Sequence, residues 1–323
     1  RIKTILREKE KDRNTRIEKE FSDAQENYEK MNKGTIRARY QEVKARKQSL
    51  ENDKNAEINR LKSDWNTRVA EYKAFVQKAT AAAEKKHPAW NCDKWEELTP
   101  RTEFPEIVYT GTVPLNDSMF DLKTRQDDNF TLPDLTEFSL PVMMSYPECG
   151  SMMLRTGTQT RGTALEILFN PALRILTSFP PAKARFTILD PVGLGQNFSA
   201  LMHLADYDES LVGGRIWTET AHIEKRLGEI TGHIEKVIQK YLRNRYESID
   251  EYNREAGDMA EAYQFIIIAD FPNGFSELAV ERLMSILNSG VKCGVYTLIQ
   301  LKEKQPLPEM FREKTLLEQA LVI

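Results

Sequence analysis

The chain has 323 residues, of which 40% are hydrophobic and 29% are charged, and its net charge at pH 7 is −3. This length and composition fit a water-soluble protein of about two domains. The longest purely apolar run, residues 265–269, is far shorter than the roughly 20 residues of a membrane span, so a membrane-spanning class is excluded.

Three cysteines lie far apart, without the spacing of a zinc site or a disulfide framework. No signal-peptide pattern opens the chain, and we expect a cytoplasmic protein. Residues 1–90 carry 23 basic and 15 acidic side chains, a net charge of +8, whereas the remainder carries −11. A start in mid-helix and an apolar end at 320–323 lead us to expect a fragment of a longer polypeptide.

Apolar residues recur at alternating steps of four and three residues over 17–31 and again over 65–79. This spacing is the seam of a heptad repeat and predicts an α-helical coiled-coil arm over residues 1–88. Gly34 lies where the spacing widens, so one long helix and a helical hairpin both remain open. The arm also predicts self-association or attachment to another coiled-coil subunit.

A group of basic residues around and after Gly34 is a candidate DNA-binding site. Its members are Lys33, Arg37, Arg39, Lys44, Arg46 and Lys47. Phosphate contacts require such clusters, but a solvated coiled-coil flank has the same composition, and we favour that interpretation.

Residues 89–147 change to short alternating segments separated by prolines, and they predict a connector with a few short strands, such as 107–113. The polar, acidic stretch 116–129 is expected to form a loop.

From residue 148 to 323, apolar strand-like runs alternate with helical patterns. Strands are predicted at 151–154, 185–189, 264–269 and 294–301, and helices at 163–177, 220–246 and 276–288. Near-continuous apolar strands that alternate with helices indicate an α/β domain whose largely parallel sheet is covered on both faces.

The stretch 157–164 reads Gly-Thr-Gln-Thr-Arg-Gly-Thr-Ala and keeps Gly157 and Gly162 of the phosphate-binding pattern G-x-x-x-x-G-K-[ST]. Thr163 replaces the lysine that holds the phosphates, and Ala164 replaces the hydroxyl that holds magnesium. These four residues are the candidate nucleotide contacts, and we expect binding of ATP and Mg²⁺ to be weak or absent. A plain glycine turn between a strand and a helix is the alternative interpretation.

Asp270 ends the most strand-like segment of the chain and is the candidate magnesium ligand. It is followed by Phe271 and Pro272, so the carboxylate that would activate water is absent there. Asp190 also follows a strand, and we expect it to gather with Asp270 and the glycine loop beyond the carboxyl ends of the strands. A polar residue that only caps the turn into Pro272 is the alternative for Asp270.

Five segments occur in a recognisable order after residue 150. They are FTILDP (186–191), HIEKR (222–226), YLRNRYESIDEYN (241–253), YQFIIIAD (263–270) and GVKCGVYTL (290–298). In this order the stretch 152–308, about half the chain, resembles the FtsK/SpoIIIE-type DNA translocases of the HerA/FtsK branch of RecA-like P-loop ATPases.

The resemblance implies a RecA-like sheet in a machine that uses ATP to move on or remodel double-stranded DNA as a ring or row of modules. By position, Thr163 stands at the family's lysine, Ala164 at its Ser/Thr, Asp270 at its magnesium aspartate and Phe271 at its glutamate. Because three of these four positions depart from the family, we predict a catalytically degenerate module with a structural or regulatory role.

Two alternatives remain at this point. The first is a coiled-coil scaffold whose acidic body binds only protein partners, because a net charge of −11 repels DNA phosphates. The second is a module that binds ATP and borrows catalytic groups from a neighbour, with Arg161, Arg215 or Arg226 offered in trans.

Overall fold

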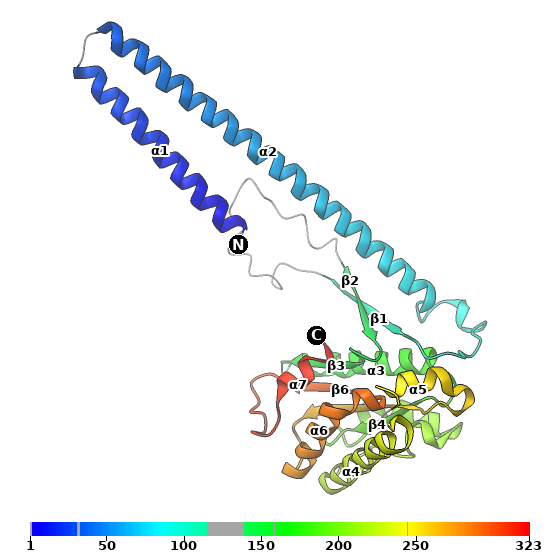
Figure 1. Cartoon of the computed structure of the whole chain (residues 1–323). Helices are drawn as coiled ribbons and strands as arrows, with labels where there is room; N and C mark the ends of the chain where they lie inside the picture. Colours follow the sequence, from blue (N-terminus) through cyan, green and yellow to red (C-terminus); the bar gives the residue numbers. More distant parts are fainter. Residues whose placement is uncertain (1, 31–32, 115–138, 158, 244) are drawn as a thin grey trace. The chain divides into compact units, whose positions relative to one another are not determined.

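The computed structural model describes residues 2–30, 33–114, 139–157, 159–243 and 245–323, and the loop expected at 116–129 lies outside them (Figure 1). The described residues belong to two compact units. The first lies within Arg1–Phe75, and the second comprises Val76–Pro114 and Ser139–Ile323. The domain boundaries expected after residues 88 and 147 stay a prediction.

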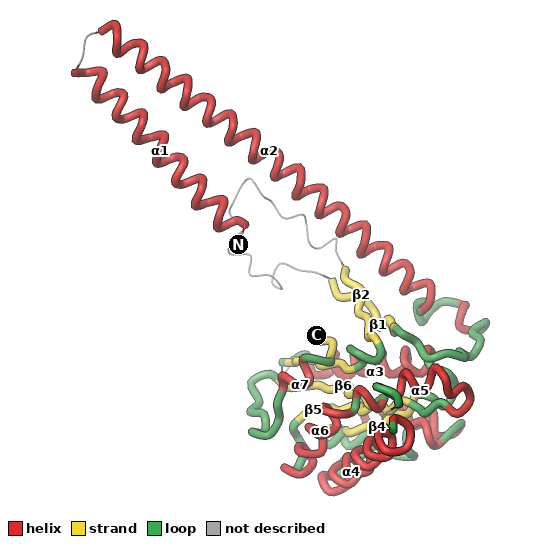
Figure 2. Tube along the Cα trace, in the orientation of Figure 1, coloured by secondary structure: helices red, strands yellow, loops and turns green. Residues whose placement is uncertain are grey.

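The arm consists of two helices, α1 (Ile2–Lys30) and α2 (Lys33–Lys86), that run antiparallel (Figure 2). Lys54 of α2 lies 2.7 Å from Glu10 of α1, whereas Arg46, nearer the start of α2, lies 3.7 Å from Glu20, nearer the end of α1. The arm is therefore a helical hairpin, and Gly34 is the second residue of α2.

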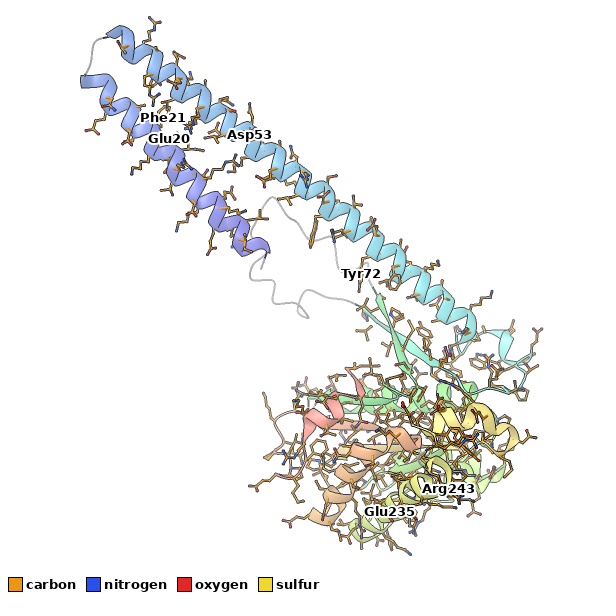
Figure 3. The ribbon with its side chains drawn as sticks, viewed as in Figure 1. Glu20, Phe21, Asp53, Tyr72, Glu235 and Arg243 are labelled. Carbon is orange, nitrogen blue, oxygen red and sulfur yellow. The ribbon has the colours of Figure 1, made fainter. Side chains whose placement is uncertain are left out.

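Apolar and basic side chains meet along the hairpin (Figure 3). The rings of Phe21 and Tyr40 are 5.9 Å apart, and the ammonium group of Lys47 lies 4.9 Å from the centre of the Phe21 ring. Such contacts bury apolar surface along the heptad seam, while charged side chains cover the flanks.

The second unit starts within α2 and continues into the connector, which contains a short 3₁₀ helix (Asp93–Trp95) and the strands β1 (Ile107–Pro114) and β2 (Ser139–Ser145). β1 and β2 pair as an antiparallel hairpin with a bulge between Tyr109 and Gly111. The expected short strands of the connector are thus present.

Five strands form the main sheet of the second unit. They are β3 (Ser151–Thr156), β4 (Ala184–Leu189), β5 (Tyr263–Phe271), β6 (Val295–Lys302) and β7 (Ala320–Val322). All pairings are parallel, in the order β4-β5-β6-β3-β7. The predicted α/β class with a parallel sheet is therefore confirmed.

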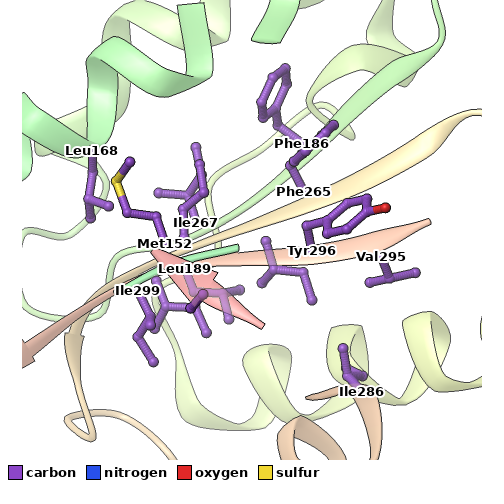
Figure 4. Close-up of a cluster of buried hydrophobic side chains, with 14 of the residues drawn as sticks. Met152, Leu168, Phe186, Leu189, Phe265, Ile267, Ile286, Val295, Tyr296 and Ile299 are labelled. Atoms are coloured by element: carbon purple, nitrogen blue, oxygen red, sulfur yellow. The ribbon is translucent and has the colours of Figure 1, made fainter. Parts of the chain in front are cut away.

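Helices cover both faces of this sheet. They are α3 (Arg161–Ser178), α4 (Thr220–Lys236), α5 (Ile249–Ala256), α6 (Glu277–Ser289) and α7 (Glu313–Leu317). Leu168 of α3 and Ile286 of α6 lie on opposite sides of the strands (Figure 4), and both side chains are buried. All nine residues of β5 are buried, which explains its nearly continuous apolar sequence.

Shorter helical segments join these elements. Four are 3₁₀ helices at Gln196–Asp206, Glu209–Leu211, Gly257–Met259 and Val291–Cys293. The expectation of one helix over 220–246 is wrong: α4 ends at Lys236, a π-helix follows at Val237–Leu242, and Arg243 has a φ of +42°. A left-handed residue cannot continue a right-handed helix, so the helix ends there.

None of the described helices combines the length and the apolar composition that crossing a bilayer requires. The long helices of the arm carry charged side chains throughout.

The end of α2 is attached to α3 by buried polar contacts. Nδ1 of His87 is 3.3 Å from the hydroxyl of Ser178, and Arg174 donates a 2.7 Å hydrogen bond to the carbonyl of Pro88. The Arg174 guanidinium also lies 4.0 Å from the ring of Trp90. Burial first, and then the cations Arg174, Arg101 and Lys86, lower the pKa of His87 from 6.5 to about 4.

We expect the free energy of unfolding to fall as the pH is lowered from 6.5 to about 4, the window between the unfolded and folded pKa of His87. In this window the unfolded chain binds a proton that the folded chain rejects, so acid favours unfolding. His87→Gln should make the pH dependence shallower, as measured by urea unfolding at stepped pH. His203→Gln, at an exposed site, is the matched control, and equal slopes in wild type and His87→Gln would contradict the assignment.

Candidate functional site

The carboxyl ends of the strands form the candidate site. From β3 the chain passes through α3 to β4 at one side of the sheet, whereas from β6 it passes through α7 to β7 at the other side. β3 and β6 are neighbours, so the connections change direction between them, and this is the position at which α/β sheets generally bind ligands. The glycine loop follows β3, and Asp190 and Asp270 lie at the same end of the sheet, beyond β4 and near the end of β5.

The glycine loop joins β3 to α3 and is short. β3 ends at Thr156 and α3 begins at Arg161, one residue before Gly162. Both the backbone N–H and the hydroxyl of Thr160 lie 3.3 Å from the carbonyl of Gly157, which closes the turn. The strand, loop and helix therefore follow one another as the phosphate-binding pattern requires.

The two substituted positions of the pattern lie in the first turn of α3. Thr163 is exposed, and Ala164 is only 3% exposed. A lysine side chain at residue 163 would lie at an exposed position. A serine at residue 164 would add a hydroxyl group at a buried position. The loop joins a strand to a helix, and residues 163 and 164 carry neither the lysine nor the hydroxyl of the phosphate-binding pattern.

A bidentate ion pair joins the start of α3 to the end of β5. Nε and Nη2 of Arg161 donate hydrogen bonds to the two carboxylate oxygens of Asp270, each over 2.6 Å. The Asp270 side chain is 6% exposed and that of Arg161 is 36% exposed. The hydrogen bond to Asp270 raises the pKa of Arg161 above its usual value, and the nearby carboxylate of Asp190 adds to this rise.

The backbone of Asp270 is also held in place. Its φ of +55° is left-handed, a conformation that costs free energy for residues other than glycine. Its N–H donates to Oε1 of Gln300 over 2.7 Å, and Nε2 of Gln300 donates to the hydroxyl of Thr156 over 2.6 Å. This chain of buried groups crosses β5, β6 and β3, and it compensates the left-handed backbone.

On its other side, Asp270 organises the turn after β5. Its carbonyl accepts hydrogen bonds from the backbone N–H and the side-chain amide of Asn273, over 2.9 and 2.8 Å. Gln305, beyond β6, donates to the amide oxygen of Asn273 over 3.1 Å. The backbone carbonyl of Asp270 thus holds this turn, while its carboxylate binds Arg161.

Asp190 lies beyond the end of β4 and is completely buried. Its carboxylate accepts hydrogen bonds from the backbone of Gly193 and from the backbone and side chain of Asn197. Asp190 therefore shares the carboxyl end of the sheet with Asp270, but its carboxylate is engaged in its own loop.

The residues at this site do not fit magnesium bound in the manner of P-loop ATPases. Mg²⁺ needs oxygen ligands, but both carboxylate oxygens of Asp270 already bind Arg161, and the side chain of Ala164 has no oxygen. Among the described residues, no group of three or more His, Cys, Asp or Glu side chains is placed to hold a metal ion.

The other two arginines considered as donors to a neighbour are engaged within the chain. Arg226 donates to the hydroxyl of Thr187 and to Glu229, both over 3.0 Å. The guanidinium of Arg215 stacks 3.8 Å from the ring centre of Trp217.

The basic group of the arm is partly paired. Arg39 lies 2.8 Å from Glu42, Arg46 contacts Glu20 of α1, and Lys47 covers an aromatic ring of α1. The remaining members with described side chains are exposed: Arg37 and Lys44. Part of the positive charge is thus used within the hairpin.

Sequence reasoning missed Gln300 and Thr156 as parts of the site, and it did not pair Arg161 with Asp270. Gln300 is, with Thr297, a polar residue within the largely apolar run 294–301, which is a usable signal. Nothing local reveals the ion pair, because its partners are 109 residues apart.

No protein-family model matches the sequence, and no curated protein matches it. Solved structures show a distant likeness of fold. The conjugation coupling protein TcpA of pCW3, in its monomer form with ATPγS, is 12% identical with a TM-score of 0.46, over 71% of this chain and 55% of that chain.

Two secretion proteins have similar sequence identities to this chain and similar TM-scores. The cytoplasmic domain of the type VII secretion ATPase EccC of Thermomonospora curvata is 16% identical with a TM-score of 0.45, over 67% of this chain and 26% of that chain. EssC (ATPases 2 and 3) of Geobacillus thermodenitrificans is 13% identical with a TM-score of 0.43, over 66% of this chain and 37% of that chain. The chain spans about half or less of the length of these proteins, and its likeness to FtsK/SpoIIIE-family ATPases is structural and distant.

Proposed function

We propose that this chain is a non-hydrolysing module of an FtsK/SpoIIIE-type machine that moves or remodels DNA. The observation that carries the proposal is the bidentate ion pair between Arg161 and Asp270. A guanidinium group compensates the carboxylate that, by the sequence resemblance, stands where the family holds magnesium. The module would contribute binding surfaces to the machine and would not hydrolyse ATP itself.

The residue after Asp270 supports the same proposal. Phe271 stands at the family's glutamate position and is completely buried. Its ring lies 5.0 Å from that of Phe275 and 4.7 Å from that of Phe311, so it belongs to an aromatic cluster. A glutamate at residue 271 would bury a charge among these rings, which is unfavourable. The position therefore serves packing in place of water activation.

A module that does not hydrolyse ATP contributes to a larger assembly through the partners that its surfaces bind. The helical hairpin offers a long surface for a coiled-coil partner, and the α/β body offers the carboxyl end of its sheet. The role of DNA rests on the sequence resemblance alone, whereas the loss of hydrolysis rests on the residues of the site. The two parts of the proposal are tested separately.

We expect no magnesium-dependent release of phosphate from ATP by the whole chain, because a lysine, a hydroxyl and a base are missing. Thr163→Lys with Ala164→Ser should tighten ATP binding without making it depend on Mg²⁺, since Arg161 still holds Asp270. Adding Arg161→Gln should introduce that dependence, as measured by calorimetric titration. Hydrolysis by the wild-type chain that Asp270→Ala abolishes would overturn the proposal.

Arg161→Gln should lower the free energy of unfolding by about 2–3 kcal/mol, because it leaves a buried carboxylate without its partner. Arg155→Gln is the matched control, since its pair with Glu313 lies at the surface and should contribute less than about 1 kcal/mol. Equal losses in the two variants would argue against a special role for the Arg161 pair.

Double-stranded DNA should bind the whole chain at low salt and dissociate as salt is raised, as measured by fluorescence anisotropy. Replacing Arg37 and Lys44, two exposed basic residues of the arm, by glutamine should weaken binding if the arm makes the contact. Absence of binding at low salt would favour a protein-binding scaffold over a DNA-associated module.

A further inference from the structure

A groove of about 330 Å³ lies between β1 and α3, and this volume is in the range of pockets that bind ligands. Residues 110–113 of β1 line one side, and Val142 and Met152 add buried apolar surface. The residues of α3 that line the other side are three or four positions apart and so share one helix face: Thr163, Glu166, Ile167 and Asn170. The groove thus has a strand on one side and a helix on the other.

The pairing of β1 with β2 decides which backbone groups of β1 face away from the hairpin. In an antiparallel pair, residues alternate between bonding to the partner strand and facing away from it. The N–H and the carbonyl of Ser145 in β2 bond to Cys149, so Ser145 faces away from β1. By alternation Pro141 also faces away, which suits a residue without an N–H. The residue opposite Pro141 is Thr112, so the N–H and the carbonyl of Thr112 point away from β2.

This outer edge of β1 faces α3. The side-chain amide of Asn170 in α3 donates a 2.5 Å hydrogen bond to the carbonyl of Thr110, two residues before Thr112. Thr112 is exposed and lines the groove. Among the described residues, its N–H and its carbonyl have no hydrogen-bond partner outside the hairpin. A strand edge with a free donor and a free acceptor beside a groove is where an extended peptide can add as a further strand.

The lining of the groove indicates which side chains such a peptide would carry. Successive side chains of a strand point to opposite faces, so alternate ones would reach the buried Val142 and Met152, and the others would lie toward solvent. Of the lining residues one is charged, Glu166, which is exposed and takes part in no ion pair within the described chain. Aliphatic side chains therefore suit the buried surface, and a cation suits Glu166.

We propose that this groove binds an extended segment of a partner protein in which aliphatic and basic residues alternate. The segment adds to β1 as a further strand by bonding to the N–H and the carbonyl of Thr112. Its aliphatic side chains contact Val142 and Met152, and a lysine or arginine pairs with Glu166. This site goes beyond the proposed function, because it involves neither DNA nor the Arg161–Asp270 pair.

Synthetic peptides test this site on the whole chain. The probe is a blocked, fluorescein-labelled pentapeptide, Lys-Val-Lys-Val-Lys, whose binding is followed by fluorescence anisotropy, and we expect a Kd below about 1 mM. N-methylation of the two valines or of the three lysines removes alternate backbone donors and keeps the charge of the peptide. Because only one of these two sets of N–H groups can face β1, one methylated peptide should bind about tenfold more weakly than the other.

Variants of the chain test the two polar contacts. Thr112→Pro removes the N–H that faces the groove and should weaken binding of the lysine peptide about tenfold, whereas Thr112→Ser keeps this donor and should bind as the wild type does. Glu166→Lys should lose the lysine peptide and bind Glu-Val-Glu-Val-Glu in its place, because the sign of the pair is exchanged. Glu235→Lys, the same change at another exposed position, is the control that should keep the wild-type preference.

The methylated peptides probe the hydrogen bonds of Thr112 in the unaltered chain, so the test does not depend on the folding of Thr112→Pro. Three results would overturn the proposal. They are absence of lysine-peptide binding by the wild type, equal affinities of the two methylated peptides, and an unchanged peptide preference in Glu166→Lys.

Discussion

The carboxyl end of the sheet depends on the compensation of one buried charge. An aspartate with a side-chain exposure of 6%, Asp270, needs a partner of opposite charge, because an isolated carboxylate in such a place is very unfavourable. Arg161 supplies that partner from the start of α3. The pair therefore fixes the glycine loop, the first turn of α3 and the end of β5 relative to one another, and Gln300 extends the connection through β6 to β3.

This compensation has a consequence for chemistry. In a P-loop ATPase the strand-end aspartate is paired with a metal that arrives with the nucleotide, so the site changes charge as ligand binds and leaves. A guanidinium attached to the same chain is permanently charged and permanently present. Asp270 thus has a permanent partner within the chain, and Phe271 beside it is part of the core.

Asp190 shows a second solution to the same physical problem. It is also a buried carboxylate after a neighbouring strand, but its charge is compensated by N–H groups of its own loop and by an amide. Backbone N–H groups can stabilise a carboxylate without a counter-ion. The first solution joins the start of α3 to the end of β5, and the second holds the loop after β4, in which Leu194 has a φ of +50°.

The sequence alone determined the elements whose signal is local. Heptad spacing identified the helical arm, and apolar runs alternating with helical patterns identified the parallel sheet, because periodicity reports which faces are buried. Only the tertiary structure decided that the arm folds into a hairpin, that the helix after α4 becomes a π-helix, and that Arg161 binds Asp270. These outcomes depend on pairing between distant segments and on the full environment of each side chain. Gln300 lies between the two cases: its polarity stood out in an apolar strand, but its partners became known only when β3 and β5 were placed on either side of β6.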